Sequence, residues 1–156
     1  SSSEAHIKTQ DEISTLINEL KHKGKKIVFT NGCFDLLHAG HVKYLEASKS
    51  YGDILIVGLN SNQSVSLLKG PRRPINSEKD RAYIIAALES VDYVVIFNED
   101  NPYSLIKSIK PNILTKGADY KGKEVIGSDL VDELKLIDLV DDKSTSKLIK
   151  NIQRKY

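Results

Sequence analysis

Two histidines, His38 and His41, stand three residues apart where an apolar run gives way to a helical pattern. The run 25–29 predicts a buried strand, and residues 42–48 have helical spacing. Free backbone N–H groups and the positive end of a helix dipole meet at such a turn, which favours anion binding. Gly40 lies between the histidines, and its missing Cβ lets a ligand approach the backbone closely. The pattern therefore predicts phosphate contacts at this turn.

The same turn has other chemical interpretations. Metal ligation by the two histidines lacks a third and fourth ligand at a recognisable spacing, whereas a pair of helix-capping histidines stays open. Cys33 is a candidate nucleophile, but no cation-rich partner besides the histidines favours a lowered thiol pKa. A small residue in a tight turn is the role that the sequence favours for it. Asp35 stays open between a base, a helix N-cap and a contact to substrate hydroxyls.

Polar residues also follow three of the other four predicted strands. The strands are expected at 25–29, 53–60, 91–97, 112–115 and 135–140. The residues after or at their ends include Asn60, Lys116 to Tyr120, and Ser144, Thr145 and Ser146. Ligands of open parallel sheets bind beyond the carboxyl ends of the strands, so these groups are candidates for one site. Lys69, Arg72 and Arg73 lie in a loop with glycine and two prolines. They suit either a solvated loop or a mobile phosphate clamp.

Helical patterns separate the predicted strands. Thr9 and Glu12 have the spacing of a capping box before an N-terminal helix, and Gly24 ends that segment. Strands that alternate with helices predict an α/β fold, a doubly wound parallel sheet of about five strands with helices on both faces. We expect residues 1–8 to lie outside this fold as a disordered, processed or recombinant edge, and 9–156 to form one domain.

Composition narrows the functional class. The chain has 156 residues and a formal net charge of +2, which does not favour nucleic-acid binding. A single cysteine excludes an internal disulfide framework and a cysteine-rich zinc site. The first residues are polar and no apolar run approaches membrane-spanning length, so we expect no membrane partner and a cytoplasmic location.

Four sequence blocks carry a resemblance to a known family, together with the histidine pair and the segment 144–146. The blocks are Thr30–Asp35, Lys69–Asn76, Val91–Val95 and Lys116–Tyr120. Over about residues 25–152 the chain resembles the HxGH nucleotidyltransferase superfamily, in its cytidylyltransferase-like branch. Within that branch it is most similar to the adenylyltransferase (ADP-heptose synthase) domains. Two features depart from that pattern. The given sequence has no sugar-kinase domain of the kind that is often fused to such domains, and Asp132 to Leu134 replace glycines usually found before the last strand.

The resemblance implies a Rossmann-like sheet and an activity. It implies transfer of AMP from ATP to D-glycero-β-D-manno-heptose 1-phosphate, which yields pyrophosphate and ADP-heptose for lipopolysaccharide core or other surface heptose glycans. It also implies Mg²⁺ carried by ATP, no metal ligands in the protein, a homodimer and a sugar kinase acting upstream. The alternatives are a glycerol-3-phosphate cytidylyltransferase or FAD synthetase of the same superfamily, and a non-catalytic nucleotide-binding module.

Roles for individual residues complete the prediction. We expect His38 and His41 to contact the phosphates, and by the resemblance Lys69 and Arg81 add positive charge, so these four form the catalytic set. The expected nucleotide contacts are Asn31, Gly32, Cys33, Phe34, His38, Gly40, His41, Lys116, Gly117, Asp119, Ser144, Thr145 and Ser146. The candidates for the sugar phosphate are Asp35, Asn60, Arg72 and Arg73.

Overall fold

The computed structural model describes residues 2–139 and residue 152. Within them, six parallel strands form one sheet in the order β1-β4-β3-β2-β5-β6. The strands are β1 (Ile7–Lys8), β2 (Ile27–Gly32), β3 (Ile54–Asn60), β4 (Tyr93–Phe97), β5 (Ile113–Gly117) and β6 (Glu133–Ile137). This arrangement confirms the predicted α/β parallel sheet. The predicted last helix, with Ser144, Thr145 and Ser146, lies outside the described residues.

Five α-helices connect the strands within the described residues. They are α1 (Gln10–His22), α2 (Ala39–Lys49), α3 (Asn62–Lys69), α4 (Glu78–Ala86) and α5 (Tyr103–Ile109). The capping box at Thr9 and Glu12 is confirmed: the Thr9 side chain accepts from the Glu12 N–H, and the Glu12 carboxylate accepts from the Thr9 N–H. This reciprocal pair satisfies two donors at the start of α1.

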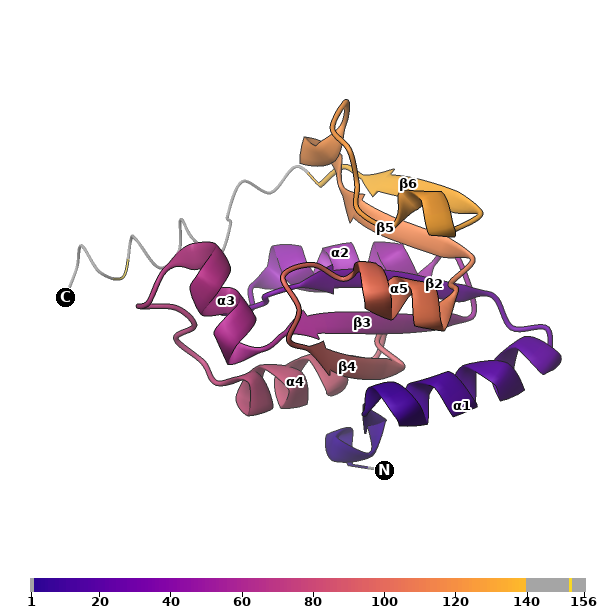
Figure 1. Ribbon diagram of the computed structural model, residues 1–156, viewed down its shortest axis with the longest axis horizontal. Helices are drawn as coiled ribbons and strands as arrows, with labels where there is room; N and C mark the ends of the chain where they lie inside the picture. The colour runs from indigo at the N-terminus through magenta and orange to yellow at the C-terminus, as the bar shows by residue number, and fades with distance from the viewer. Residues whose placement is uncertain (1, 140–151, 153–156) are drawn as a thin grey trace.

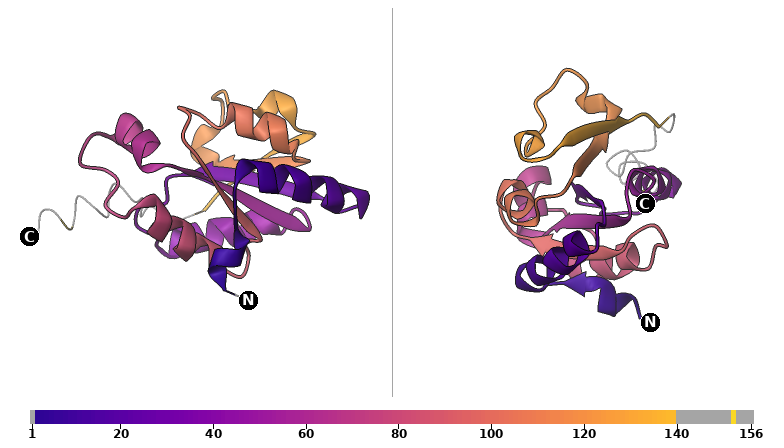
Figure 2. Two further views of the ribbon diagram at one scale, coloured as in Figure 1. Left: turned by 60° about the horizontal axis from the view of Figure 1, so that its bottom comes forward. Right: turned by 90° about the vertical axis from the view of Figure 1, so that its right-hand side faces the viewer.

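The helices cover both faces of the sheet, as predicted (Figures 1 and 2). Side chains alternate along β2, so Phe29 packs on one face with α1 and α5, and Val28 on the other with α2 and α4. Phe29 aligns with Ile56 of β3 and Leu114 of β5, which places it in the middle of the first layer. Burial on both faces explains the nearly continuous apolar runs of the central strands.

The N-terminal segment differs from the expectation that residues 1–8 lie outside the fold. Residues Ser3–His6 form a 3₁₀ turn, and β1 pairs with β4 through Ile7 and Val94. His6 Nδ1 lies 3.0 Å from the Asp92 carbonyl oxygen. A strand of two residues is too short to produce a hydrophobic period, which explains why the sequence predicted about five strands rather than six. At the other edge, β6 begins at Glu133, earlier than predicted.

The strand order places the switch point of the sheet beside β2. From β2 the chain proceeds to β3 and β4 on one side, and it then crosses to β5 and β6 on the other side. The connections that leave β2 and β5 therefore diverge, and they open a crevice at the carboxyl ends of these strands. The turn that contains His38 and His41 lies at this edge. Within residues 2–139 and 152, no helix has the length and apolarity needed to cross a bilayer.

Candidate functional site

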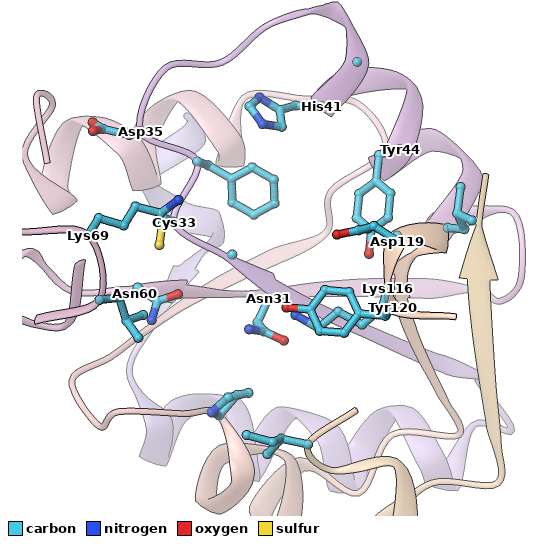
Figure 3. Close-up of a pocket in the computed structure, with 18 of the residues that line it drawn as sticks. Asn31, Cys33, Asp35, His41, Tyr44, Asn60, Lys69, Lys116, Asp119 and Tyr120 are labelled. Atoms are coloured by element: carbon cyan, nitrogen blue, oxygen red, sulfur yellow. The ribbon is translucent and has the colours of Figure 1, made fainter. Parts of the chain in front are cut away.

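A cavity of about 910 Å³ lies at the carboxyl ends of β2, β3 and β5 (Figure 3). Its size suits a ligand as large as a nucleotide. Most of the residues that the sequence predicted for the site line this cavity. They are Asn31, Gly32, Cys33, Phe34, Asp35, His38, Gly40, His41, Asn60, Lys69, Arg73, Lys116, Gly117 and Asp119. They come from segments far apart in the sequence, and the sheet brings them to one edge.

The two histidines cap α2 reciprocally. His38 is the N-cap, and its Nδ1 accepts from the Gly40 N–H at 3.1 Å, whereas Nδ1 of His41 accepts from the His38 N–H at 3.2 Å. Their rings stack with centroids 3.9 Å apart, and Phe34 packs edge-on against His41. Because each Nδ1 is an acceptor, the proton of each neutral ring is on Nε2. Capping and phosphate contact are therefore compatible roles, since they use different nitrogens.

Buried polar atoms without partners gather around this cavity. Within the part of the chain that the structure describes, four buried side-chain polar atoms have no hydrogen-bond partner: His38 Nε2, Arg73 Nη2, Asn31 Oδ1 and Ser90 Oγ. The first three belong to side chains that line the cavity, and Ser90 does not. A buried polar group without a partner costs about 1–3 kcal/mol, and such groups are rare in folded proteins. Two of the three atoms are donors, which indicates a ligand rich in acceptor oxygens.

Cations occupy two walls of the cavity. Lys69 ends α3 on one wall, and Lys116 projects from β5 on the other, with Nζ 5.2 Å from the Tyr120 ring centroid. Burial lowers the pKa of the Lys116 ammonium, so an anion beside it would favour its charged form.

Burial raises the pKa of the Cys33 thiol, although Lys69, Arg81 and Arg73 oppose the shift. A protonated thiol is a poor nucleophile, which agrees with a spatial role for Cys33.

Asp35 anchors the loop 70–76. It is only 1% exposed, and its carboxylate accepts from Arg73 Nε at 2.8 Å and from the N–H groups of Ile75 and Asn76 at 2.9 Å. The Asn76 amide also donates to the Asp35 carbonyl oxygen. These bonds occupy the lone pairs of the carboxylate. Asp35 is therefore a loop anchor and neither a free base nor the cap of α2, and its contact to substrate stays a prediction.

This anchor predicts a pH-dependent contribution to stability. Burial raises the pKa of the Asp35 carboxyl, but the hydrogen bonds from Asn76, Ile75 and Arg73 outweigh burial and hold the pKa below its ordinary value. The contribution is therefore present above about pH 3.9 and is lost as the pH falls through the lowered pKa. We expect the difference in unfolding free energy between wild type and Asp35→Asn, from urea titrations, to shrink from pH 7 to pH 3. A difference that stays constant over this range would contradict the assignment.

Arg81 does not reach the cavity. It is 1% exposed, and its guanidinium donates to the carbonyl oxygens of Asn76, Cys33 and Asn60 and to Oδ1 of Asn62. These bonds tie α4 to the turn after β2 and to the end of β3. These contacts place Arg81 in the scaffold, and its predicted charge contribution to the triphosphate stays a prediction. Arg72 is exposed and does not line the cavity, in contrast to its neighbour Arg73.

Comparison with known proteins now assigns the chain to a family. Residues 29–155 match the family described as cytidylyltransferase-like. The chain belongs to this family. It is 64% identical over 153 residues to the bifunctional protein HldE of Aliarcobacter butzleri, covering 98% of this chain and 32% of that protein. For the bifunctional protein HldE of Sulfurimonas denitrificans the identity is 61%, with the same coverage. The chain thus spans about a third of the length of these curated relatives.

Solved structures show the same architecture. The lipopolysaccharide core biosynthesis protein from Thermoplasma volcanium is 28% identical, with a TM-score of 0.63 over 74% of this chain and 99% of that chain. A pantoate–β-alanine ligase from Francisella tularensis, solved with β,γ-ATP and β-alanine, has a TM-score of 0.62 at 19% identity. This second match covers 93% of this chain and 72% of that chain and shows a shared fold. Both matches agree with the parallel sheet of this cytidylyltransferase-like chain.

Sequence analysis missed Tyr44 in this member of the family. Its hydroxyl lies 2.8 Å from Thr30 Oγ1 and 3.3 Å from Thr115 Oγ1, and Ser48 Oγ lies 2.8 Å from the same Thr115 oxygen. These hydroxyls join α2 to β2 and β5, and the Tyr44 side chain lines the cavity. Its position one helical turn after His41 was the available signal, because residues at i and i+3 share a helix face.

Tyr120 also lines the cavity, and sequence analysis placed it in the candidate segment Lys116 to Tyr120 without giving it a role of its own. It follows Asp119 in the 3₁₀ turn Ala118–Tyr120 after β5. A Cβ on Gly117 would lie 2.5 Å from Asp119 Oδ1 in its present position. The absence of that Cβ lets the Asp119 carboxylate fold back along the cavity wall.

Within the described residues no group of three or more His, Cys, Asp or Glu side chains is placed to hold a metal ion.

Proposed function

We propose that this domain transfers AMP from ATP to D-glycero-β-D-manno-heptose 1-phosphate, with release of pyrophosphate and formation of ADP-heptose. The observation that carries the proposal is Nε2 of His38, which has no partner among the described residues and is buried at a cationic cavity on a helix N-terminus. This geometry supports binding and transfer of phosphate groups. High identity to bifunctional HldE proteins over nearly the whole chain supports the heptose acceptor, as does the likeness to a lipopolysaccharide core biosynthesis protein.

The chemistry is an in-line displacement at phosphorus. An anionic oxygen of the sugar phosphate attacks the α-phosphorus of ATP, and the bond from that phosphorus to the α,β-bridging oxygen breaks with its electron pair leaving on pyrophosphate. The nucleophile is already ionised, so no general base and no covalent enzyme intermediate is needed. The protein holds two polyanions together and stabilises the charge that develops on the α-phosphate oxygens. Mg²⁺ enters as part of the substrate MgATP and neutralises charge on its phosphates.

The residues of the cavity divide between these tasks. Nε2 of His38 and of His41 donates toward the α-phosphate, with the N-terminus of α2 behind them. Lys69 and Lys116 supply positive charge from opposite walls. Figure 3 shows Lys116, Asp119 and Tyr120 together, and Lys69, Cys33 and Asn60 on the other side. We assign the β5 wall to the nucleoside, since an aromatic ring and a carboxylate suit a base and ribose hydroxyls, and the β3 wall to the acceptor.

The proposed reaction implies partners and a compartment. Its acceptor is a phosphorylated sugar, so a sugar kinase must act upstream. ATP as donor is consistent with a cytoplasmic location. A homodimer remains part of the proposal, and sedimentation of the purified protein tests it.

A pyrophosphate-release assay tests the function. With ATP and D-glycero-β-D-manno-heptose 1-phosphate we expect turnover at least about tenfold above that with any other pair. The panel replaces ATP by CTP, and the acceptor by glycerol 3-phosphate or FMN. A preference for CTP with glycerol 3-phosphate, or for ATP with FMN, would assign the domain to another transferase of the superfamily. Binding of ATP with no pyrophosphate release from any pair would make it a nucleotide-binding module.

A further inference from the structure

Arg73 has one guanidinium nitrogen, Nε, bound to Asp35 and another, Nη2, without a partner among the described residues. Nε donates to Asp35 Oδ2 at 2.8 Å, whereas Nη2 is buried and has no partner within residues 2–139 and 152. The side chain is 11% exposed and lines the cavity. A guanidinium presents its donors in a rigid fork, so the bond at Nε fixes the direction of the remaining N–H groups. The unpartnered donor is therefore held in a set orientation.

The surrounding loop is built to hold that orientation. Asp35 binds the backbone N–H groups of Ile75 and Asn76 as well as Arg73, so one carboxylate fixes both the loop and the side chain. On the other side of the loop, Ser66 Oγ donates to the Arg73 carbonyl oxygen at 2.5 Å. A cation kept in place before the ligand arrives loses little conformational freedom on binding. The partner that suits Nη2 is an anionic oxygen, because a charge-assisted bond offsets burial of the charge.

The position of Arg73 indicates which phosphate group it meets. It lies in the loop that follows α3, on the same wall as Lys69 and Asn60. The aromatic and acidic side chains suited to a nucleoside, Tyr120 and Asp119, follow β5 on the opposite side of β2. His38 caps α2, the helix that follows β2, and β2 is the strand between β3 and β5. In an in-line displacement the attacking oxygen of the acceptor lies opposite the leaving pyrophosphate, and the nucleoside 5′-oxygen is a separate substituent of the α-phosphorus. The acceptor and the nucleoside therefore need separate parts of the cavity.

We propose that Arg73 binds the phosphate group of the acceptor and selects phosphorylated sugars, and that Asp35 is a positioning residue that aims it. This inference rests on the proposed transfer reaction and adds the group that recognises its second substrate. Arg73 acts on the acceptor and not on ATP. Asp35 acts through Arg73 and does not touch either substrate.

Steady-state kinetics of Arg73→Gln test the first part. We expect the KM for the sugar phosphate to rise about 10–100-fold, as for loss of one charge-assisted hydrogen bond, and the KM for ATP to change less than about twofold. Arg73→Lys keeps the charge but cannot bind Asp35 and the ligand in the same fork, so about a tenfold increase should persist. The matched control is Arg72→Gln, in the exposed neighbour outside the cavity, with both KM values unchanged. An equal effect at Arg72, or a rise in the KM for ATP alone, would overturn the proposal.

A double-mutant cycle tests the positioning role. Asp35→Asn should raise the KM for the sugar phosphate in the same direction as Arg73→Gln, and the double variant should be no worse than Arg73→Gln alone. Additive effects on KM would show that Asp35 acts independently of Arg73. A loss confined to kcat or to thermal stability would make it purely structural.

Calorimetry separates this inference from the proposed function. The sugar phosphate is titrated into the protein with α,β-methylene-ATP, which lacks the reactive bridging oxygen, and inorganic phosphate is titrated as the second probe. Binding that weakens about 10–100-fold in Arg73→Gln supports the subsite even where wild type shows no turnover, and the function alone then fails. Wild-type turnover with binding that does not depend on Arg73 leaves the function standing and rejects the subsite. No binding of either probe to wild type rejects both.

Discussion

His38→Asn is expected to lower kcat by about 10²–10³-fold while the protein stays folded. Asparagine is a good N-cap, so its side-chain oxygen can still accept from the Gly40 N–H and preserve the start of α2. What the substitution removes is the imidazole Nε2, a buried donor at the cavity that has no partner in the described part of the chain. Loss of one preorganised donor to a transition-state oxyanion has an effect of this size. The assay is pyrophosphate release at saturating ATP and sugar phosphate.

The control for this variant is His22→Asn, at the exposed end of α1. It should keep the kcat of wild type, and thermal unfolding of both variants should lie within a few degrees of wild type. An His38→Asn enzyme with a kcat within a few-fold of wild type would restrict His38 to helix capping. The catalytic assignment would then be left with His41 and the lysines.

Arg81→Ala is expected to lower the free energy of unfolding by roughly 3 kcal/mol or more. The guanidinium serves four acceptors, three of them backbone carbonyl oxygens, and the change leaves buried ones without a donor. Each such group costs about 1–3 kcal/mol, and a cavity adds to the loss. Urea unfolding followed by circular dichroism measures the difference.

Lys79→Ala is the matched control, because Lys79 is an exposed cation on the same helix, α4. It should change the unfolding free energy by no more than about 0.5 kcal/mol. A stable Arg81→Ala protein that has lost turnover would reverse the assignment. Arg81 would then contact the triphosphate, as the family resemblance implied.

Sequence patterns predicted most of the fold because they depend on local physics. The capping box at Thr9, the apolar runs of β2 and β3, and the strand-to-helix turn before α2 follow from periodicity and hydrogen-bonding groups. The crevice followed from parallel topology, which brings the ends of β2, β3 and β5 to one edge. These rules place residues in the right region of the molecule without any knowledge of its tertiary contacts.

Sequence patterns are least informative for side chains whose contacts depend on partners distant in the sequence. Arg81 has the residue type of a phosphate ligand, but it is turned to backbone carbonyl oxygens that no local pattern reveals. Asp35 is bound by residues about forty positions away. Arg72 and Arg73 are adjacent and alike in sequence, yet only Arg73 lines the cavity. Only the folded chain shows which of these side chains faces the cavity and which is bound within the protein.

The most direct test of the account is a crystal structure with α,β-methylene-ATP and Mg²⁺. The account predicts an α-phosphate oxygen about 3 Å from His38 Nε2, with the remaining phosphates at the N-terminus of α2 and the nucleoside on the β5 wall beside Tyr120. A nucleotide bound away from the turn of His38 and His41 would contradict it.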